Sequence, residues 1–263
     1  MTQSPPRNII IFGKTGAGKS SIVNMVLGRD EAEVSGRAIG CTFESKGYDT
    51  SINGSPIKLH DTSGLNEAAK GTVPAREAVI NLYKLIRNLD SGVSLLVYCI
   101  RGQRVEQTTV NNYKMFYEAF CQKNVPIVVV INGLENEENM DDWWRENETV
   151  FESYGMHFKG HACVVSTKGK KNRSGVYLFE EEYEQSRKKV QEMIGGCQLS
   201  KPWRMERKNW FVTVIKSSWN WLASIFGWPK AVLSSVLYYA FRMMGMSEEE
   251  ALEHTNKVEQ GMV

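Results

Sequence analysis

This chain of 263 residues has almost no excess of charge of one sign, because its 32 Lys and Arg are nearly balanced by 30 Asp and Glu. A net charge of +2 gives no electrostatic indication of a partner, and we expect no nucleic-acid partner. The sequence also lacks internal repeats and low-complexity tracts. Its 42% of hydrophobic and 24% of charged residues are typical of a soluble globular protein with a real core.

Paired cysteine motifs are missing as well. The five cysteines show no C-x-x-C spacing and no Cys/His ligand spacing, which argues against a zinc site or a disulfide framework. We expect Cys99 and Cys163, which lie in apolar runs, to be buried and reduced thiols. The first eight residues are polar and carry no apolar signal-peptide core. Together these absences predict a cytoplasmic location.

Short apolar runs alternate with helical patterns along the first two-thirds of the chain. The strands expected from these runs are 9–12, 93–100, 125–131 and 162–166, and the expected helices are 20–27, 75–89, 108–122, 143–154 and 178–194. Asn53-Gly54-Ser55 between the extended runs 46–52 and 56–60 predicts a hairpin. We therefore expect an α/β three-layer domain over residues 1–198, with a mostly parallel sheet and one antiparallel edge strand.

The segment from Gly13 to Ser20, Gly-Lys-Thr-Gly-Ala-Gly-Lys-Ser, matches the P-loop pattern and lies between an expected strand and an expected helix. Its glycines let the backbone approach a phosphate, and the N-terminus of the helix favours negative charge. Lys19 is expected to reach the β- and γ-phosphates. The predicted phosphate-binding residues are Gly13, Thr15, Gly16, Ala17, Gly18, Lys19, Ser20, Ser21 and Gly64.

Magnesium ligands are predicted from the same region and from the next strand. The Ser20 hydroxyl is expected to ligate Mg²⁺, and Asp61 in Asp-Thr-Ser-Gly lies at a strand end that faces the P-loop. Thr42, in the polar segment 29–44, is the candidate for a second hydroxyl ligand, with Thr50 and Ser45 as alternatives. The predicted metal set is therefore Ser20, Thr42 and Asp61.

Base-reading motifs follow two later strands. Asn132 and Glu135 occupy the positions of N-K-x-D in GTPases, and Ser166 and Lys168 occupy those of S-A-K. A carboxylate at Glu135 can accept the two N–H donors of guanine, which adenine lacks, so the predicted ligands are GTP and GDP with Mg²⁺. Gly133 replaces the usual lysine, which removes one stacking contact and leaves a relaxed purine site as the alternative.

On these motifs the chain resembles septin-like GTPases, and within them the immunity-associated nucleotide-binding proteins and the chloroplast outer-envelope import GTPases. The resemblance covers about residues 8–194. It is carried by three segments, namely Gly-Lys-Thr-Gly-Ala-Gly-Lys-Ser-Ser-Ile-Val-Asn at 13–24, Asp-Thr-Ser-Gly-Leu at 61–65, and 94–100 with the following Arg-Gly-Gln-Arg. The resemblance implies a P-loop GTPase domain whose site is completed by nucleotide-dependent dimerisation or by a partner.

Hydrolysis itself has no assigned catalytic residue. Leu65 follows the Asp-Thr-Ser-Gly motif where many GTPases place a glutamine that orients water, so slow turnover is expected. Arg101 is a candidate to reach a neighbouring subunit's nucleotide, as is Arg104, and solvated loop arginines are the alternative. A second hypothesis is a scaffold that binds nucleotide, scarcely hydrolyses it, and recruits partners at a membrane.

The remainder, 199–263, is expected to be a helical tail. Residues 193–247 hold seven Lys or Arg and one Glu, a net charge of +6, and 203–228 holds five of the seven tryptophans. An interfacial helix on an anionic membrane through 199–246, helices packed on the domain or on a dimer partner, and a membrane-inserted hairpin all remain open. We expect the body to bind nucleotide without this tail. Ser247 and Glu250 form a capping-box pattern at the start of a last helix.

Overall fold

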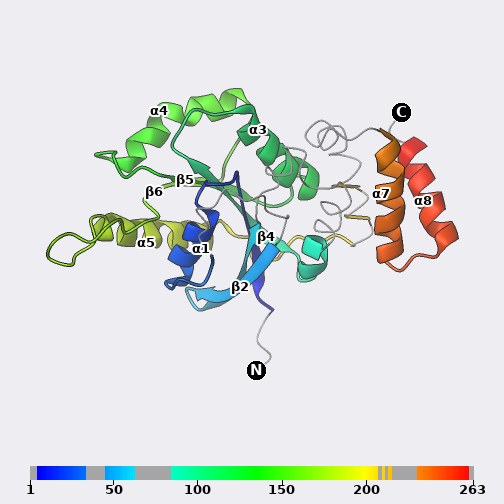
Figure 1. Cartoon of the computed structure of the whole chain (residues 1–263), viewed down its shortest axis with the longest axis horizontal. Coiled ribbons are helices and arrows are strands. Elements are labelled where there is room, and N and C mark those ends of the chain that lie inside the picture. Colours follow the sequence, from blue (N-terminus) through cyan, green and yellow to red (C-terminus); the bar gives the residue numbers. More distant parts are fainter. Residues whose placement is uncertain are drawn as a thin grey trace.

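The computed structural model describes residues 5–33, 45–62, 84–206, 209–210, 213–214 and 230–260. Its centre is a six-stranded sheet with the order β2-β3-β1-β4-β5-β6 (Figure 1). The strands are β1 (Arg7–Phe12), β2 (Ser45–Ile52), β3 (Ser55–Thr62), β4 (Val93–Arg101), β5 (Ile127–Asn132) and β6 (Gly160–Val164). Every neighbouring pair is parallel except β2 with β3, which confirms the mostly parallel sheet.

The antiparallel edge arises from a local turn signal. Asn53 and Gly54 both adopt positive φ angles, of 50° and 74°, and join β2 to β3 in a two-residue turn. Such turns favour Asn-Gly because glycine has no Cβ to clash and asparagine tolerates the left-handed region. The predicted hairpin is therefore confirmed, and it places Asp61 of β3 beside Ile11 of β1.

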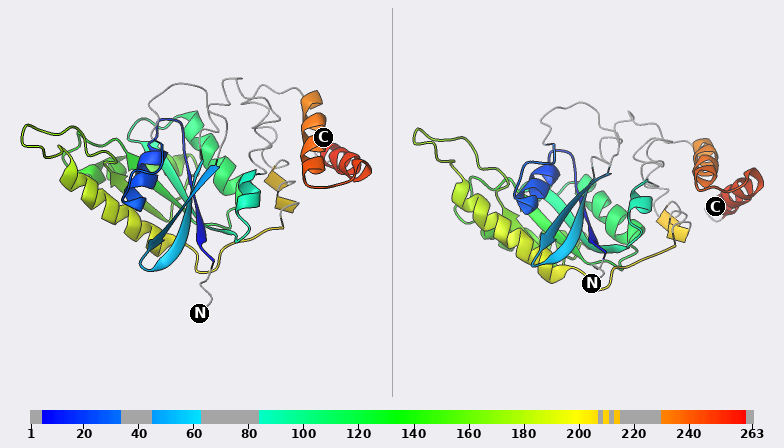
Figure 2. Two further views of the ribbon diagram at one scale, coloured as in Figure 1. Left: turned by 60° about the horizontal axis from the view of Figure 1, so that its bottom comes forward. Right: turned by 90° about the horizontal axis from the view of Figure 1, so that it is seen from below.

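Helices cover both faces of the sheet, as Figure 2 shows. One face packs against α1 (Lys19–Leu27) and α5 (Glu180–Cys197), and the other against α3 (Gln107–Tyr113), a π-helix η2 (Lys114–Phe120) and α4 (Met140–Ser153). Alternate side chains of the buried strands supply two separate apolar clusters, one on each face. The three-layer α/β architecture is confirmed.

The single α-helix predicted over 108–122 is corrected by the structure, because η2 continues α3 with wider turns. A π-helical stretch rotates the side chains that follow it relative to an α-helix. Here Met115, Phe116, Ala119 and Phe120 are all buried, and the Phe116 ring stacks on Phe12 at 4.2 Å between centroids. Aromatic packing on the sheet thus accompanies the change in helix type.

The chain beyond α5 begins as part of the body. Trp203 exchanges two backbone hydrogen bonds with Val93 at the start of β4, with N···O distances of 2.8 and 2.9 Å. The Trp210 indole is buried, and its N–H donates to the Phe120 carbonyl over 2.7 Å. Trp203 and Trp210, which belong to the tail predicted over 199–263, therefore pack on the body, as in the alternative in which the tail packs on the domain.

The C-terminal helices α7 (Lys230–Met243) and α8 (Glu248–Gln260) pack against each other at the end of the molecule away from α5 (Figure 1). The capping box is confirmed, because the Glu250 N–H donates to Ser247 Oγ and the Ser247 N–H donates to the Glu250 carboxylate. Among the described residues, no helix combines the length and apolar character that crossing a membrane requires.

Candidate functional site

The P-loop joins β1 to α1 and lies against the neighbouring strands. Gly13 has a φ of 152°, and a Cβ there would stand 2.1 Å from the Cys99 carbonyl oxygen of β4. Gly18 has a φ of 90°, and its Cβ would stand 2.1 Å from the Asn132 amide nitrogen. Both positions require glycine, for conformation and for close approach. Gly16, by contrast, faces open space, because a Cβ added there would meet nothing within 4 Å.

Lys19 lies inside the curl of the P-loop. Its buried ammonium donates to the carbonyl oxygens of Gly13 and Lys14, at 3.1 and 3.4 Å. No carboxylate of the described residues pairs with this ammonium, and neutral carbonyls alone compensate a buried charge incompletely. A phosphate at the N-terminus of α1 would supply that partner, so the arrangement favours an anion at this position.

Ser20 and Asp61 form the polar pair expected for a magnesium site. Ser20 Oγ donates to Asp61 Oδ2 over 2.8 Å, while the buried Asp61 Oδ1 has no hydrogen-bond partner among the described residues. Burial raises the pKa of the Asp61 carboxyl, opposed by the Ser20 hydrogen bond and by the charge of Lys19. An unpartnered carboxylate oxygen beside a hydroxyl fits a hard cation such as Mg²⁺.

The second predicted hydroxyl ligand, Thr42, lies outside the described residues, as do Gly64 and Leu65. The two alternatives are separated by strand register. Ser45 pairs with Thr62, next to Asp61, whereas Thr50 pairs with Ile57 toward the other end of the hairpin. Register therefore disfavours Thr50 as a ligand that shares a metal with Asp61.

Asn132, at the end of β5, connects three loops. Its amide nitrogen donates to the Ala17 carbonyl of the P-loop at 3.3 Å, and its amide oxygen accepts from the Ser166 N–H at 3.2 Å. The buried amide thus ties the loop after β5 to the P-loop and to the loop after β6. The structure brings together Asn132, Ser166 and the predicted phosphate residues of the P-loop.

Glu135 and Lys168 lie on the two loops that Asn132 connects. Glu135 is half-exposed in the turn between β5 and α4. The Lys168 ammonium lies 3.7 Å from a Glu180 carboxylate oxygen and over the Tyr183 ring, 5.1 Å from its centroid. Its stem therefore runs beside the start of α5, which holds the side chain near the loop that begins with Ser166.

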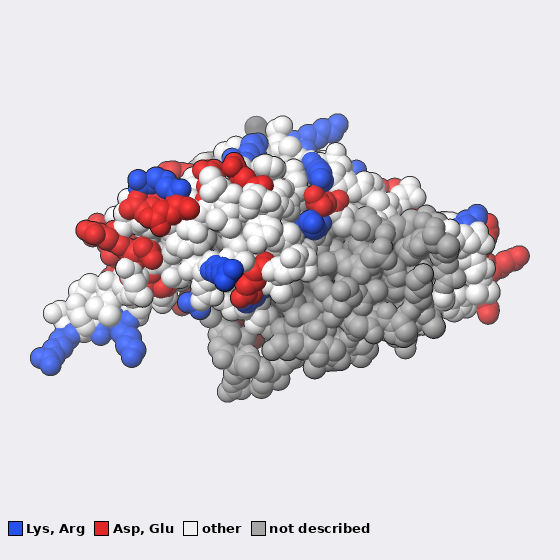
Figure 3. Space-filling model, turned by 90° about the horizontal axis from the view of Figure 1, so that it is seen from above, with Lys and Arg blue, Asp and Glu red and all other residues white. Residues whose placement is uncertain are grey.

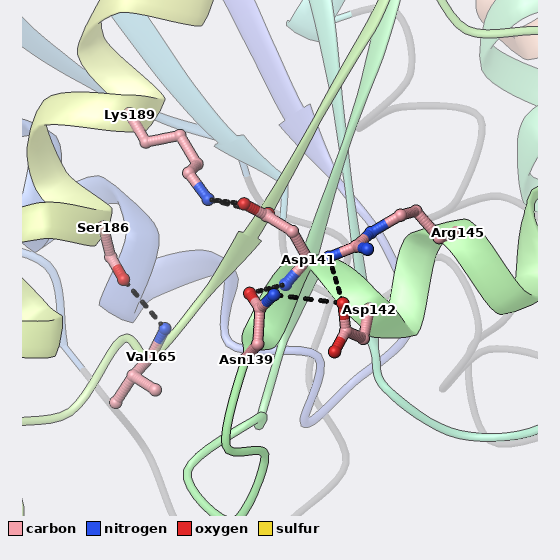
Figure 4. Close-up of polar contacts among 7 residues, drawn as sticks. All are labelled: Asn139, Asp141, Asp142, Arg145, Val165, Ser186 and Lys189. Atoms are coloured by element: carbon pink, nitrogen blue, oxygen red, sulfur yellow. Dashed lines mark hydrogen bonds and ion pairs between the residues drawn. The ribbon is translucent and has the colours of Figure 1, made fainter.

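A layer of polar contacts that the sequence did not predict lies beneath these loops (Figure 4). Lys189 of α5 donates to both carboxylate oxygens of Asp141 at the start of α4, at 2.7 and 2.9 Å. The fully buried Ser186 accepts a hydrogen bond from the Val165 N–H at 3.0 Å. These contacts fix the loops that carry Glu135 and Ser166. One sequence signal existed, since Ser186 shares a helical face with apolar Val190 and Ile194.

The loop after β4 lies on the other side of the P-loop. The Lys14 ammonium pairs with the Glu106 carboxylate at 2.8 Å, and a small cavity of about 50 Å³ lies behind this pair. Arg101 and Arg104 both line that cavity together with Gly16. The Arg101 guanidinium also extends over Gly133, where a Cβ would stand 3.1 Å from its Nε. The Arg101 side chain therefore points toward the base-reading loop of its own chain.

The surface near these loops carries charges of both signs. The loop between β6 and α5 projects from the body in Figures 1 and 2, and basic side chains mark its tip in Figure 3, with acidic side chains over the adjoining body. This loop, 165–179, contains three Lys and one Arg and no acid. Although the net charge of the chain is only +2, patches of each sign therefore lie beside the candidate site.

Comparison with known proteins places this arrangement in a family. The model of the AIG1 family matches residues 7–195. Immune-associated nucleotide-binding protein 10 of Arabidopsis thaliana is 29% identical over 54% of this chain and 31% of its own length. The tRNA modification GTPase MnmE of Pasteurella multocida is 26% identical over 72% of this chain and 37% of its own length. The chain thus spans about a third of these relatives.

Solved structures share the fold. Toc33 from Arabidopsis thaliana, in complex with GDP and Mg²⁺, has a TM-score of 0.51 at 17% identity, over 76% of this chain and 87% of its own. Era from Aquifex aeolicus, bound to GDP and AlF₄⁻, has a TM-score of 0.51 at 17% identity, over 93% of this chain and 69% of its own. Both likenesses establish the architecture of a P-loop GTPase domain.

Proposed function

The chain belongs to the AIG1 family, and from that membership and the site geometry we propose a guanine-nucleotide-binding switch that holds GTP or GDP with Mg²⁺. The hydrogen bond from Asn132 to Ala17 carries the proposal, because it joins the base-reading loop to the phosphate-binding loop. A ligand that occupies both loops carries a purine at one end and phosphates at the other. Such a ligand is a nucleoside di- or triphosphate.

Each group has a defined task in this proposal. The P-loop backbone and Lys19 bind the phosphates, and Mg²⁺ when bound neutralises charge on the β- and γ-phosphates. Ser20 and Asp61 would hold the ion, with Thr42 as the third ligand. Glu135 accepts the guanine N–H donors, and the stem of Lys168 lies along the base.

Nucleotide competition tests the proposal. We expect unlabelled GTP to displace labelled GTP at least tenfold better than ATP, about 1.4 kcal/mol, because adenine leaves the Glu135 carboxylate unpaired. Lys19→Ala should abolish binding, and Lys114→Ala, which removes an exposed lysine of η2, should leave it unchanged. Equal displacement by ATP would refute the guanine assignment, and failure of the wild-type protein to bind either nucleotide would refute the whole proposal.

Hydrolysis is proposed to be slow and to depend on self-association. Leu65 cannot orient a water molecule, so a second copy of the chain would complete the site. Arg101 and Arg104 are the two candidates for the cross-subunit group. Because the Arg101 guanidinium lies over Gly133 of the same chain, the exposed Arg104 is the better-placed group of the two.

The alternative function is a scaffold that binds nucleotide, scarcely hydrolyses it, and recruits partners at a membrane surface. The absence of a glutamine at Leu65 favours this alternative. The proposed location is then cytoplasmic, with peripheral attachment to an anionic membrane through residues 199–246. Because Trp203 and Trp210 pack on the body, that attachment would depend on the remainder of the segment.

A further inference from the structure

The base-reading motif of this chain lacks one side chain. Gly133 stands where N-K-x-D has its lysine, whose stem ordinarily lies against the base. Gly133 adopts a φ of 83°, a conformation that glycine reaches without strain. The position directly after Asn132 therefore offers backbone but no side chain to a nucleotide.

Arg101 fills the space that this glycine leaves. β4 and β5 pair in parallel with Arg101 opposite Asn132, and the Gly102 N–H donates to the Asn132 carbonyl over 2.9 Å. A Cβ added to Gly133 would stand 3.1 Å from Arg101 Nε and 3.2 Å from a terminal guanidinium nitrogen. The guanidinium of the neighbouring strand thus covers the backbone where a lysine side chain would begin.

The same arginine faces the P-loop. Arg101 lines the small cavity beside Gly16 and Ala17, and Asn132 donates to the Ala17 carbonyl. Among the described residues, no carboxylate forms an ion pair with Arg101, and its side chain is exposed. The guanidinium therefore lies between the base-reading loop and the phosphate-binding loop, with its charge available to a ligand.

We propose that Arg101 is a base-binding residue that supplies from β4 the contact missing at Gly133. A guanidinium is planar and always charged, so it stacks on an aromatic face more effectively than a lysine ammonium does. In this role it lies against the purine held by Asn132 and Glu135 of its own chain. The inference rests on the proposed nucleotide-binding function and adds a residue to that site.

This role differs in two measurable ways from that of an arginine reaching another subunit's phosphates. A contact within one chain persists at protein concentrations too low for dimers, whereas a cross-subunit contact vanishes there. A contact to the base leaves the affinity for phosphates alone unchanged. Binding of GDP and of inorganic tripolyphosphate by dilute protein therefore separates the two roles.

The experiment measures labelled GDP binding at nanomolar protein, with tripolyphosphate as a competitor, for the wild type and three variants. We expect Arg101→Ala to weaken GDP about tenfold, Arg101→Lys to weaken it less, and Arg87→Ala, the loss of an exposed arginine away from the site, to change nothing. Tripolyphosphate affinity should stay within twofold of the wild type in all variants. Thermal unfolding of each variant confirms that the exposed substitutions leave the fold intact.

Two results would overturn the inference. One is an unchanged GDP affinity in Arg101→Ala. The other is an equal loss of affinity for GDP and for tripolyphosphate, which would show that the arginine contacts the phosphates and not the base. If the wild-type protein binds GDP no more tightly than tripolyphosphate, it has no base site. The proposed function is then wrong, whatever the role of Arg101. Failure of the proposed function is thus distinguished from failure of the arginine assignment.

Discussion

Ser20 Oγ donates to Asp61 Oδ2 over 2.8 Å, which joins the first turn of α1 to the end of β3 across the base of the P-loop. The second oxygen of the same carboxylate is buried without a partner among the described residues. Ser20 and Asp61 would together hold a hard cation here. In the proposed function, the pair would therefore link nucleotide affinity to magnesium.

We predict that Ser20→Ala weakens GDP binding about tenfold when Mg²⁺ is present and leaves it unchanged in EDTA, because the hydroxyl acts on the nucleotide through the ion. The loss of its hydrogen bond to Asp61 should affect the stability of the fold. The measurement is a GDP titration of both proteins with and without Mg²⁺. An equal loss in EDTA would show that the hydroxyl acts on the phosphate or on the fold, and not through the ion.

Turnover should rise with protein concentration. Because Leu65 cannot orient water, we expect a GTPase rate on the order of 10⁻³ s⁻¹ or below in dilute protein, and a higher specific activity once the chains associate. Arg104→Ala should remove the concentration dependence and keep the affinity for GTP. A fast rate that is independent of concentration would contradict this prediction.

Ser186 should contribute to stability beyond its size. Removing the hydroxyl in Ser186→Ala leaves the buried Val165 N–H without its acceptor, which we expect to cost about 1–3 kcal/mol of unfolding free energy. Ser153→Ala, on the exposed end of α4, is the matched control and should change it by less than about 0.5 kcal/mol. Urea unfolding measures the free energy of unfolding of both variants. Equal values would show that the Ser186 hydroxyl does not stabilise the fold.

Two truncations should behave differently. Ending the chain after Ser200 removes Trp203 and Trp210, so we expect a destabilised domain, whereas ending it after Val214 keeps both and should keep nucleotide binding. Trp210→Ala in the full chain should cost about 3–5 kcal/mol, because a large buried side chain is lost. Thermal unfolding and GDP binding are the measurements.

Flotation with vesicles then tests the remainder of the tail. If residues 215–246 reach an anionic membrane, the full chain floats with anionic vesicles, less so in high salt, and the chain ending at Val214 does not. If neither protein floats, the membrane hypothesis is wrong. A stable and nucleotide-binding chain ending at Ser200 would show that the contacts of Trp203 and Trp210 are dispensable.

His60 should make the domain sensitive to acid. Burial, with a smaller effect of Lys58, lowers the pKa of His60 to about 4, and its Nε2 bonds to Asn8 Oδ1 at 2.9 Å. The unfolded chain takes up a proton below about pH 6.5 while the folded chain does not, so stability is lost as the pH falls from 6.5 to 4. Without metal, we expect His60 to contribute a loss of about 2 kcal/mol between pH 7 and pH 5, while the raised pKa of Asp61 acts in the opposite direction.

Replacing His60 by asparagine tests this pH dependence. The variant is less stable at pH 7, because a buried contact changes, but its stability should vary less between pH 7 and pH 5. Urea unfolding at the two pH values in EDTA gives the difference for each protein. If the variant and the wild type lose the same stability between pH 7 and pH 5, groups other than His60 cause the acid sensitivity.

Local chemistry made several features predictable. The turn at Asn53 and Gly54 and the capping box at Ser247 and Glu250 depend on residues within four positions of one another, and the P-loop depends on one short segment. Their conformations follow from intrinsic backbone preferences and near-neighbour hydrogen bonds. The mostly parallel sheet followed from the alternation of apolar strands and helices.

Features that depend on distant pairings were not predictable in the same way. The backbone bonds of Trp203 to Val93 and the burial of Trp210 need two segments about a hundred residues apart to meet. The position of Arg101 over Gly133 depends on the register of β4 against β5, which the hydrophobic runs leave unspecified. The wider turns of η2 likewise accompany the packing of Phe116 on Phe12 of the sheet, a contact between distant segments.

The close approach of the Arg101 guanidinium to Gly133 also constrains how these two positions vary. The Cβ of a side chain at position 133 would stand 3.1 Å from Arg101 Nε, and a small residue at position 101 would leave the backbone of Gly133 uncovered. Substitutions at the two positions should therefore be correlated across an alignment of homologous sequences. Chains with a lysine after the motif asparagine should carry a shorter residue at the end of β4, and chains with glycine there should retain the arginine.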